Sequence, residues 1–167
     1  REMERARLHE VEAESRTAEP LEPWNARPIA ELVDHVVARF HESHRHELPR
    51  LLAMAQRVEK VHADKASCPR GLAELLDGLA ADLLQHMQKE EQILFPMIRR
   101  LEASNGLPAF HCGSIANPIR QMEIEHHDAG AALERMHTLT DEYTPPTWAC
   151  NTYRAMLDSL AHLESDM

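Results

Sequence analysis

The feature that most constrains this chain is an amphipathic helical pattern between residues 72 and 97 that two ionisable residues interrupt. Apolar residues recur there at steps of three and four, a spacing that puts them on one face of a helix. In order, the positions on this face are Leu72, Leu76, Leu79, Leu83, His86, Glu90, Leu94 and Met97. His86 and Glu90 therefore lie one helical turn apart, where the pattern predicts buried apolar side chains.

A bound metal ion explains why an imidazole and a carboxylate occupy these positions. Burying an ionised glutamate is costly unless a cation compensates its charge. Both groups are ligands for iron, zinc or manganese, and a spacing of four residues lets both reach one ion from one helix. The alternative is a histidine at the edge of the core and a glutamate paired with an arginine. The neighbours off this face are expected on the solvated surface, and they are Gln85, Gln88, Lys89 and Glu91.

The composition predicts one helical domain and excludes several classes of protein. The chain has 167 residues, of which 43% are hydrophobic and only 4% aromatic, and a length of this size supports a single core. A net charge of -10 argues against binding nucleic acid or an anionic membrane. No run of eighteen apolar residues and no charged-then-apolar leader is present, so neither membrane spanning nor secretion is indicated. Twelve histidines are the first compositional sign of a metal.

The cysteines predict a reducing compartment. Cys68, Cys112 and Cys150 are isolated in the sequence and odd in number. This usage fits reduced thiols rather than a disulfide framework. We therefore expect the protein to be cytoplasmic.

Three further segments share the helical period, which predicts an all-α, up-down-up-down four-helix bundle. The expected helices cover residues 28–62, 72–100, 118–140 and 152–167. Pro49 falls inside the first of them and is expected to kink that helix without ending it, because the apolar phase resumes beyond it.

The antiparallel arrangement limits which histidines can meet His86. Counting from the first turn, the residue level with His86 on the first helix is near Leu48, within two helical turns. His41 and His44 both fall in this interval, with His41 modestly favoured. His62 lies about 31 Å from His41 along a continuous helix, so these two histidines cannot share one centre.

The third and fourth helices differ in what they offer a metal. His126 replaces an apolar residue on the buried face of the third helix, which makes it a candidate ligand. On the fourth helix the apolar residues continue through Leu163 and Met167. His162 therefore points about 100° away from this apolar face. Projecting that phase forward puts the next core positions three and seven residues after Met167. We therefore expect the fourth helix to be truncated in this sequence, with its ligands beyond the last residue.

Five stretches carry a resemblance to a known family over Pro28 to Met167. They are RFHESHRHELP, VEKVHADK, HMQKEEQILFPMI, MEIEHHDAG and TPP…AC…YRAM. They resemble the di-iron iron-sulfur cluster repair proteins, the YtfE/ScdA/DnrN group with a hemerythrin-like domain. The resemblance implies that residues 25–167 are a hemerythrin-like di-iron domain, incomplete at its C-terminus. Residues 1–24 are then the remnant of an N-terminal helical domain or linker.

The resemblance also implies the cofactor and the site. The family holds two non-haem iron ions, for which a bridging oxo or hydroxo group is expected. Carried over by position, the metal ligands are His41, His86, Glu90 and His126. Asp82 and Glu125 fall where the family has carboxylates near the centre, outside the ligand set.

The function implied is repair of iron-sulfur clusters damaged by nitric oxide or oxidants. It would proceed by iron donation, by nitric oxide chemistry at the iron, or by both. Expected partners are damaged iron-sulfur proteins and nitric oxide or oxygen as a small ligand, with a homodimer as one expected assembly. Two alternatives are a hemerythrin-like protein that binds or senses oxygen, nitric oxide or iron without turnover, and a metal-free helical interaction module.

Overall fold

The computed structural model describes residues 24–104 and 114–167, and these residues form helices and turns without a strand. The predicted N-terminal remnant, apart from residue 24, and Cys112 lie outside this part of the chain.

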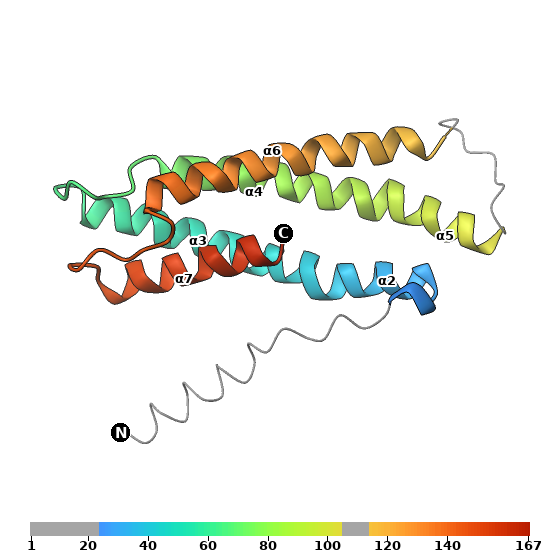
Figure 1. Cartoon of the computed structure of the whole chain (residues 1–167), viewed down its shortest axis with the longest axis horizontal. Helices are drawn as coiled ribbons and strands as arrows, with labels where there is room; N and C mark the ends of the chain where they lie inside the picture. The colour runs from blue at the N-terminus through green and yellow to red at the C-terminus, as the bar shows by residue number, and fades with distance from the viewer. Residues whose placement is uncertain (1–23, 105–113) are drawn as a thin grey trace, which may run out of the picture.

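Four antiparallel rods make up the described part of the molecule (Figure 1). The elements in chain order are η1 (Trp24–Ala26), α2 (Ile29–Val36), η2 (Val37–His41), α3 (Glu42–Val61), α4 (Leu72–Lys89), η3 (Glu90–Leu94), α5 (Phe95–Ala103), α6 (Ala116–Thr140) and α7 (Asn151–Ser165). The first rod joins α2, η2 and α3, the second joins α4, η3 and α5, and α6 and α7 are the third and fourth. The predicted all-α bundle is confirmed.

The chain passes through Pro49 without ending α3, as the phase of the apolar residues predicted. The turn between the first two rods instead closes on Gly71, whose φ of +88° is the left-handed conformation that glycine adopts without a steric penalty. In the resulting bundle α3 packs against α4 and α7, and α4 packs against α6.

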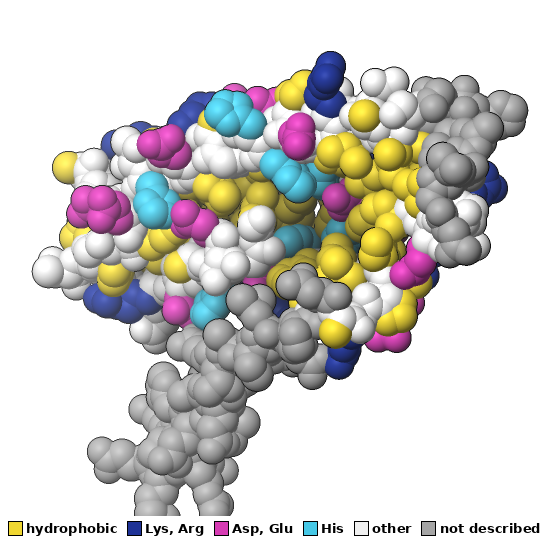
Figure 2. Space-filling model, turned by 45° about the vertical axis from the view of Figure 1, so that its right-hand side comes forward, with side chains coloured by type: hydrophobic (Ala, Val, Ile, Leu, Met, Phe, Trp, Pro, Cys, Tyr) yellow, Lys and Arg dark blue, Asp and Glu magenta, His cyan; other side chains and the backbone are white. Residues whose placement is uncertain are grey.

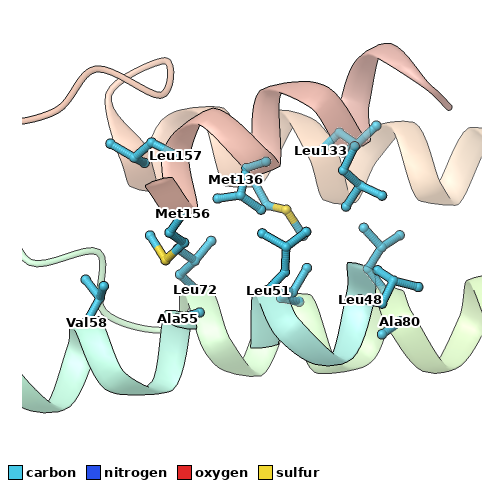
Figure 3. Close-up of a cluster of buried hydrophobic side chains, with 14 of the residues drawn as sticks. Leu48, Leu51, Ala55, Val58, Leu72, Ala80, Leu133, Met136, Met156 and Leu157 are labelled. Carbon is cyan, nitrogen blue, oxygen red and sulfur yellow. The ribbon is translucent and has the colours of Figure 1, made fainter. Parts of the chain in front are cut away.

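The main core fills the half of the bundle in which all four rods lie together (Figure 3). Its most deeply buried side chains, none more than 1% exposed, are Leu48, Leu51, Ala55, Val58, Leu72, Leu76, Met136, Met156 and Leu160. Leu72 and Leu76 lie on the face that the spacing predicted. Burying each large aliphatic side chain contributes about 1.5–3 kcal/mol, so this half of the bundle anchors the fold.

The other half of the bundle is less completely covered, because α7 ends near the middle of the molecule (Figure 1). A smaller apolar cluster holds this half together, built from Val33, Leu94, Phe95 and Met122. Met167 was expected on the apolar face of the fourth helix but is 43% exposed, because it lies after the last residue of α7.

No described helix is both long enough and apolar enough to span a membrane.

Candidate metal centre

The four side chains predicted as ligands converge between the two apolar clusters, each from a different element. His41 ends η2, His86 lies near the end of α4, Glu90 begins η3 and His126 lies in α6. Glu90 Oε2 lies 3.1 Å from His41 Nε2, and Glu90 Oε1 lies 3.4 Å from His86 Nε2. His86 Nε2 is 3.0 Å from His126 Nε2. Ligand atoms of His86, Glu90 and His126 all lie within 4.8 Å of one another.

Both rods that carry the centre change from α-helix to π-helix where they meet it. The π-helical turns are Val37–His41 and Glu90–Leu94. A π-helical turn takes in an extra residue, so neighbouring side chains are separated by less than the 100° of an α-helix. As a result Glu90 and Glu91 both reach His41, one on each ring nitrogen. Turns of this kind are frequent at functional sites.

Glu91 orients His41 from outside the centre. Its Oε1 lies 2.7 Å from His41 Nδ1, and Arg45 donates to the same oxygen at 2.6 Å. Burial opposes ionisation of Glu91, but His41 and Arg45 outweigh it and lower the pKa of this carboxyl. Glu91 was expected on the solvated surface, and that prediction is wrong because the π-helical turn rotates it toward His41.

Glu125, which lies on α6, orients His86 from outside the centre. Its Oε2 lies 2.8 Å from His86 Nδ1, while Lys89 and Gln121 donate to its other oxygen. Burial alone would raise the pKa of Glu125, but these three donors lower it to about 2. Lys89 was also expected to be merely solvated, and it instead compensates the charge of this carboxylate. Glu125 itself lies where the resemblance put a carboxylate near the centre.

The hydrogen bonds of the two histidines leave lone pairs facing Glu90. A carboxylate only accepts hydrogen bonds, so Glu91 and Glu125 require the proton of each ring to sit on Nδ1 of His41 and His86. In the neutral imidazole the Nε2 atom is then a bare acceptor, and it faces an oxygen of Glu90. Acceptors held this close repel one another. A cation, either added protons or a metal ion, must lie among them.

The pKa values reflect the same demand for positive charge. Burial opposes the charged form of His41 and His86, but carboxylates on both sides outweigh it and raise both pKa values above 6.5. Burial opposes ionisation of Glu90 too, yet the two histidines lower its pKa to about 2. The centre therefore stays anionic at Glu90 over the ordinary pH range.

The spacing of the donor atoms fits a transition metal. Two ligands bonded to one ion at about 2.1 Å, at angles between roughly 90° and 110°, are about 3.0–3.4 Å apart. The separations of Glu90 from His41 and His86, and of His86 from His126, all fall in this range. Three imidazoles and a carboxylate are a donor set suited to iron or zinc.

The remaining predicted residues occupy the edges of the centre. His41 and His44 are both buried, at 4% and 5% exposure, but only His41 contacts Glu90. His44 Nε2 finds no hydrogen-bond partner within the described chain. Asp82 is exposed and lines the same cleft. His126 was expected to be buried but is exposed, because it lines the open cleft that leads to the centre.

Two histidines away from the centre also have defined positions. His62 lies at the opposite end of the first rod, beside Trp148, so the prediction that it cannot share a centre with His41 is confirmed. His137 connects α6 to α7, because its Nε2 lies 2.6 Å from Glu164 Oε2.

An open cleft of about 1310 Å³ leads to the centre. Figure 2 shows one face of the molecule, hollowed where histidine and acidic side chains are visible among hydrophobic ones. The cleft is lined by His41, His86, Glu90 and His126 together with Val36, Phe40 and Phe95. Its size admits small ligands and solvent to the donor atoms.

Comparison with known proteins places these observations in a family context. Residues 32–166 match the model of the Hemerythrin HHE cation binding domain. The chain is 46% identical over 162 residues to the iron-sulfur cluster repair protein YtfE of Musicola paradisiaca (strain Ech703). The matched segment covers 97% of this chain and 68% of that protein. It is 45% identical over 144 residues to the protein of the same name from Enterobacter sp. (strain 638), covering 86% of this chain and 61% of that protein. The YtfE protein of Escherichia coli O1:K1 / APEC is 42% identical over 159 residues, covering 95% of this chain and 68% of its own length.

Proposed function

Since the chain belongs to the hemerythrin HHE cation-binding family, we propose that it binds iron through His41, His86, Glu90 and His126 and acts in the repair of iron-sulfur clusters. The observation that carries the iron site is the set of acceptor atoms facing one another around Glu90. The repair function rests on relatives whose name describes it. The matched segments span 61–68% of those relatives, so the activity of the whole protein is part of the proposal.

The two oxygens of Glu90 support a pair of iron ions. Oε2 faces His41, whereas Oε1 faces His86, which in turn touches His126. One iron would be held between Glu90 and His41, and the other among Glu90, His86 and His126. Glu90 would then bridge the two ions and offset part of their charge. An oxo or hydroxo bridge between them belongs to the same proposal.

Non-haem iron bound here would supply one-electron redox chemistry and open positions for a small ligand such as nitric oxide or oxygen. The chain's own residues set the conditions for it. Glu91 and Glu125 hold the protons on Nδ1 of His41 and His86, which turns Nε2 of each ring toward the centre. The cleft gives a small ligand access from solvent.

We propose a damaged iron-sulfur protein as the partner, with iron donation or nitric oxide chemistry as the route of repair. A cytoplasmic location and a homodimer complete the proposal. The open cleft also suits a second function, reversible binding or sensing of oxygen, nitric oxide or iron without turnover, because small ligands reach the donor atoms directly.

The test begins with metal analysis of the purified chain and of the His86→Ala variant. Stoichiometric iron in the first and loss of iron in the second are expected, whereas a chain without iron would overturn both functions. The reduced iron form is then exposed to nitric oxide, and separately incubated with an iron-sulfur protein damaged by nitric oxide. Continued formation of nitrous oxide or recovery of the damaged cluster supports repair. Stoichiometric, reversible binding with neither outcome identifies a carrier or sensor.

A further inference from the structure

A cysteine and a histidine from distant parts of the chain meet at the end of the bundle opposite the metal centre. His62 Nε2 lies 3.3 Å from Cys150 Sγ, although 88 positions separate the two residues. His62 caps the C-terminal end of α3, and Cys150 caps the N-terminal end of α7. The metal centre takes no part in this contact, because the 20 residues of α3 separate His62 from His41.

Aromatic rings hold the imidazole of His62 in place. The ring centroid of Trp148 lies 5.0 Å from that of His62, and Tyr153 stacks on His62 at 6.1 Å. Tyr153 is only 2% exposed, and its hydroxyl donates to the carbonyl of Ser67 in the turn before α4. Two neighbouring aromatic rings, one of them buried, therefore position the half-buried ring of His62.

The thiol of Cys150 is accessible to solvent and does not itself cap the helix that begins beside it. Cys150 is exposed, and its side chain makes no capping hydrogen bond to α7. The N-terminus of this 15-residue helix carries partial positive charge. Arg154, one turn later, donates from Nε to the carbonyl of Ala149 at 3.1 Å, so its guanidinium lies at the same helix end. Thiolates are the nucleophilic form of cysteine, and cationic surroundings of this kind are where reactive thiols occur.

Cys68 provides the contrast within the same end of the molecule. It is 7% exposed, and its thiol lies 3.8 Å from the carbonyl of Glu59. Burial raises the pKa of the Cys68 thiol. A buried thiol without a basic partner is inert toward electrophiles.

We propose that Cys150 and His62 form a thiol site that reacts with hydroperoxides, with Cys150 as the nucleophile and His62 as its base. His62 Nε2 accepts the proton of the thiol, and the thiolate sulfur attacks the peroxide. The S–O bond forms as the O–O bond breaks, so the sulfur is oxidised to a sulfenic acid and the peroxide is reduced. The leaving group, hydroxide from hydrogen peroxide or alkoxide from an organic hydroperoxide, takes the proton from the His62 imidazolium and departs as water or alcohol. A second thiol can then condense with the sulfenic acid, which gives a disulfide and releases water.

The experiment compares thiol reaction rates in the folded chain. Iodoacetamide measures nucleophilicity without interference from bound iron, and dilute hydrogen peroxide with dimedone measures sulfenic acid. Peptide mass spectrometry follows Cys150 and Cys68 separately. Cys150 is expected to react at least tenfold faster than Cys68 and faster than Cys150 in the same chain unfolded in urea. The His62→Gln variant is expected to lose about tenfold of the Cys150 rate, while the exposed His46→Gln variant keeps it.

The unfolded-chain comparison needs no substitution, so it stands even if His62→Gln disturbs the end of the bundle. Equal Cys150 rates in the folded and urea-unfolded chain would overturn the proposal. So would an unchanged Cys150 rate in a folded His62→Gln variant. The metal content of either variant has no bearing on this result.

Discussion

Replacing Glu90 with glutamine tests the physical argument for the metal centre most directly. The amide has nearly the shape of the carboxylate, so packing between the two apolar clusters is kept. It lacks the negative charge that two buried histidines require, and it cannot bridge two cations. We therefore expect Glu90→Gln to lose iron at every pH and to lose stability in the metal-free protein only where the histidines are protonated.

The size of the stability loss follows from the pKa of Glu90. A pKa lowered from 4.5 to about 2 corresponds to about 3 kcal/mol of favourable interaction, at roughly 1.4 kcal/mol for each tenfold change. The Glu90 side chain is only 13% exposed, so solvent screens this interaction weakly. Because the folded-state pKa is lowered, the stabilisation is present above pH 4.5 and is lost as the pH falls toward 2. It also fades at high pH, where His41 and His86 become neutral.

The assay is thermal unfolding of the metal-free proteins near pH 6 and near pH 9, with iron content measured in parallel. Near pH 6 the variant should melt roughly 6–12 °C below the parent chain, and near pH 9 the difference should largely disappear. Glu123→Gln, at an exposed position of α6, is the matched control and should change neither property. Full iron occupancy in Glu90→Gln, or a melting difference that does not depend on pH, would refute the reasoning.

Three further predictions follow from the same geometry. Glu91→Gln should weaken metal binding about 10- to 100-fold without unfolding the chain, as measured by competition with a chelator, and unchanged affinity would remove Glu91 from the centre. The rise in melting temperature on zinc loading should be larger near pH 8 than near pH 6, because metal binds the neutral rings. The raised pKa values of His41 and His86 mean that their protonation stabilises the metal-free fold at low pH, and that this stabilisation is lost as the pH rises through these values. A gain in melting temperature that shrinks with rising pH would contradict this. Leu51→Ala, at a fully buried site, should cost about 2–5 kcal/mol in denaturant unfolding, and a loss below about 1 kcal/mol would show that this core is loosely packed.

Much of the fold could be predicted from the sequence, because helical periodicity is a local property. The apolar steps through Leu72 and Leu163 identified two buried helix faces. The same steps placed His86 and Glu90 on such a face, and this conflict between charge and burial was enough to predict a cation. The short turns then made neighbouring helices antiparallel, which brought His41 within reach of His86.

Only the tertiary structure decided how the centre is completed. An α-helical reading places Glu91 about 100° from Glu90 and therefore in solvent, whereas the π-helical turn brings both to His41. The pattern does not show such a turn, because it depends on how two rods pack against each other. The resemblance placed Glu125 near the centre, but its pairing with His86, across 39 positions, came only from the structure.

The coverage of the bundle likewise depends on how the helices pack. The spacing put His126 on a buried face, but burial requires a neighbouring helix over that face, and His126 lines an open cleft instead. The contact between His62 and Cys150 joins two helix ends whose separation in space no local pattern specifies. Periodicity determined which faces are apolar, and the packing of the rods determined which side chains meet and which stay open to solvent.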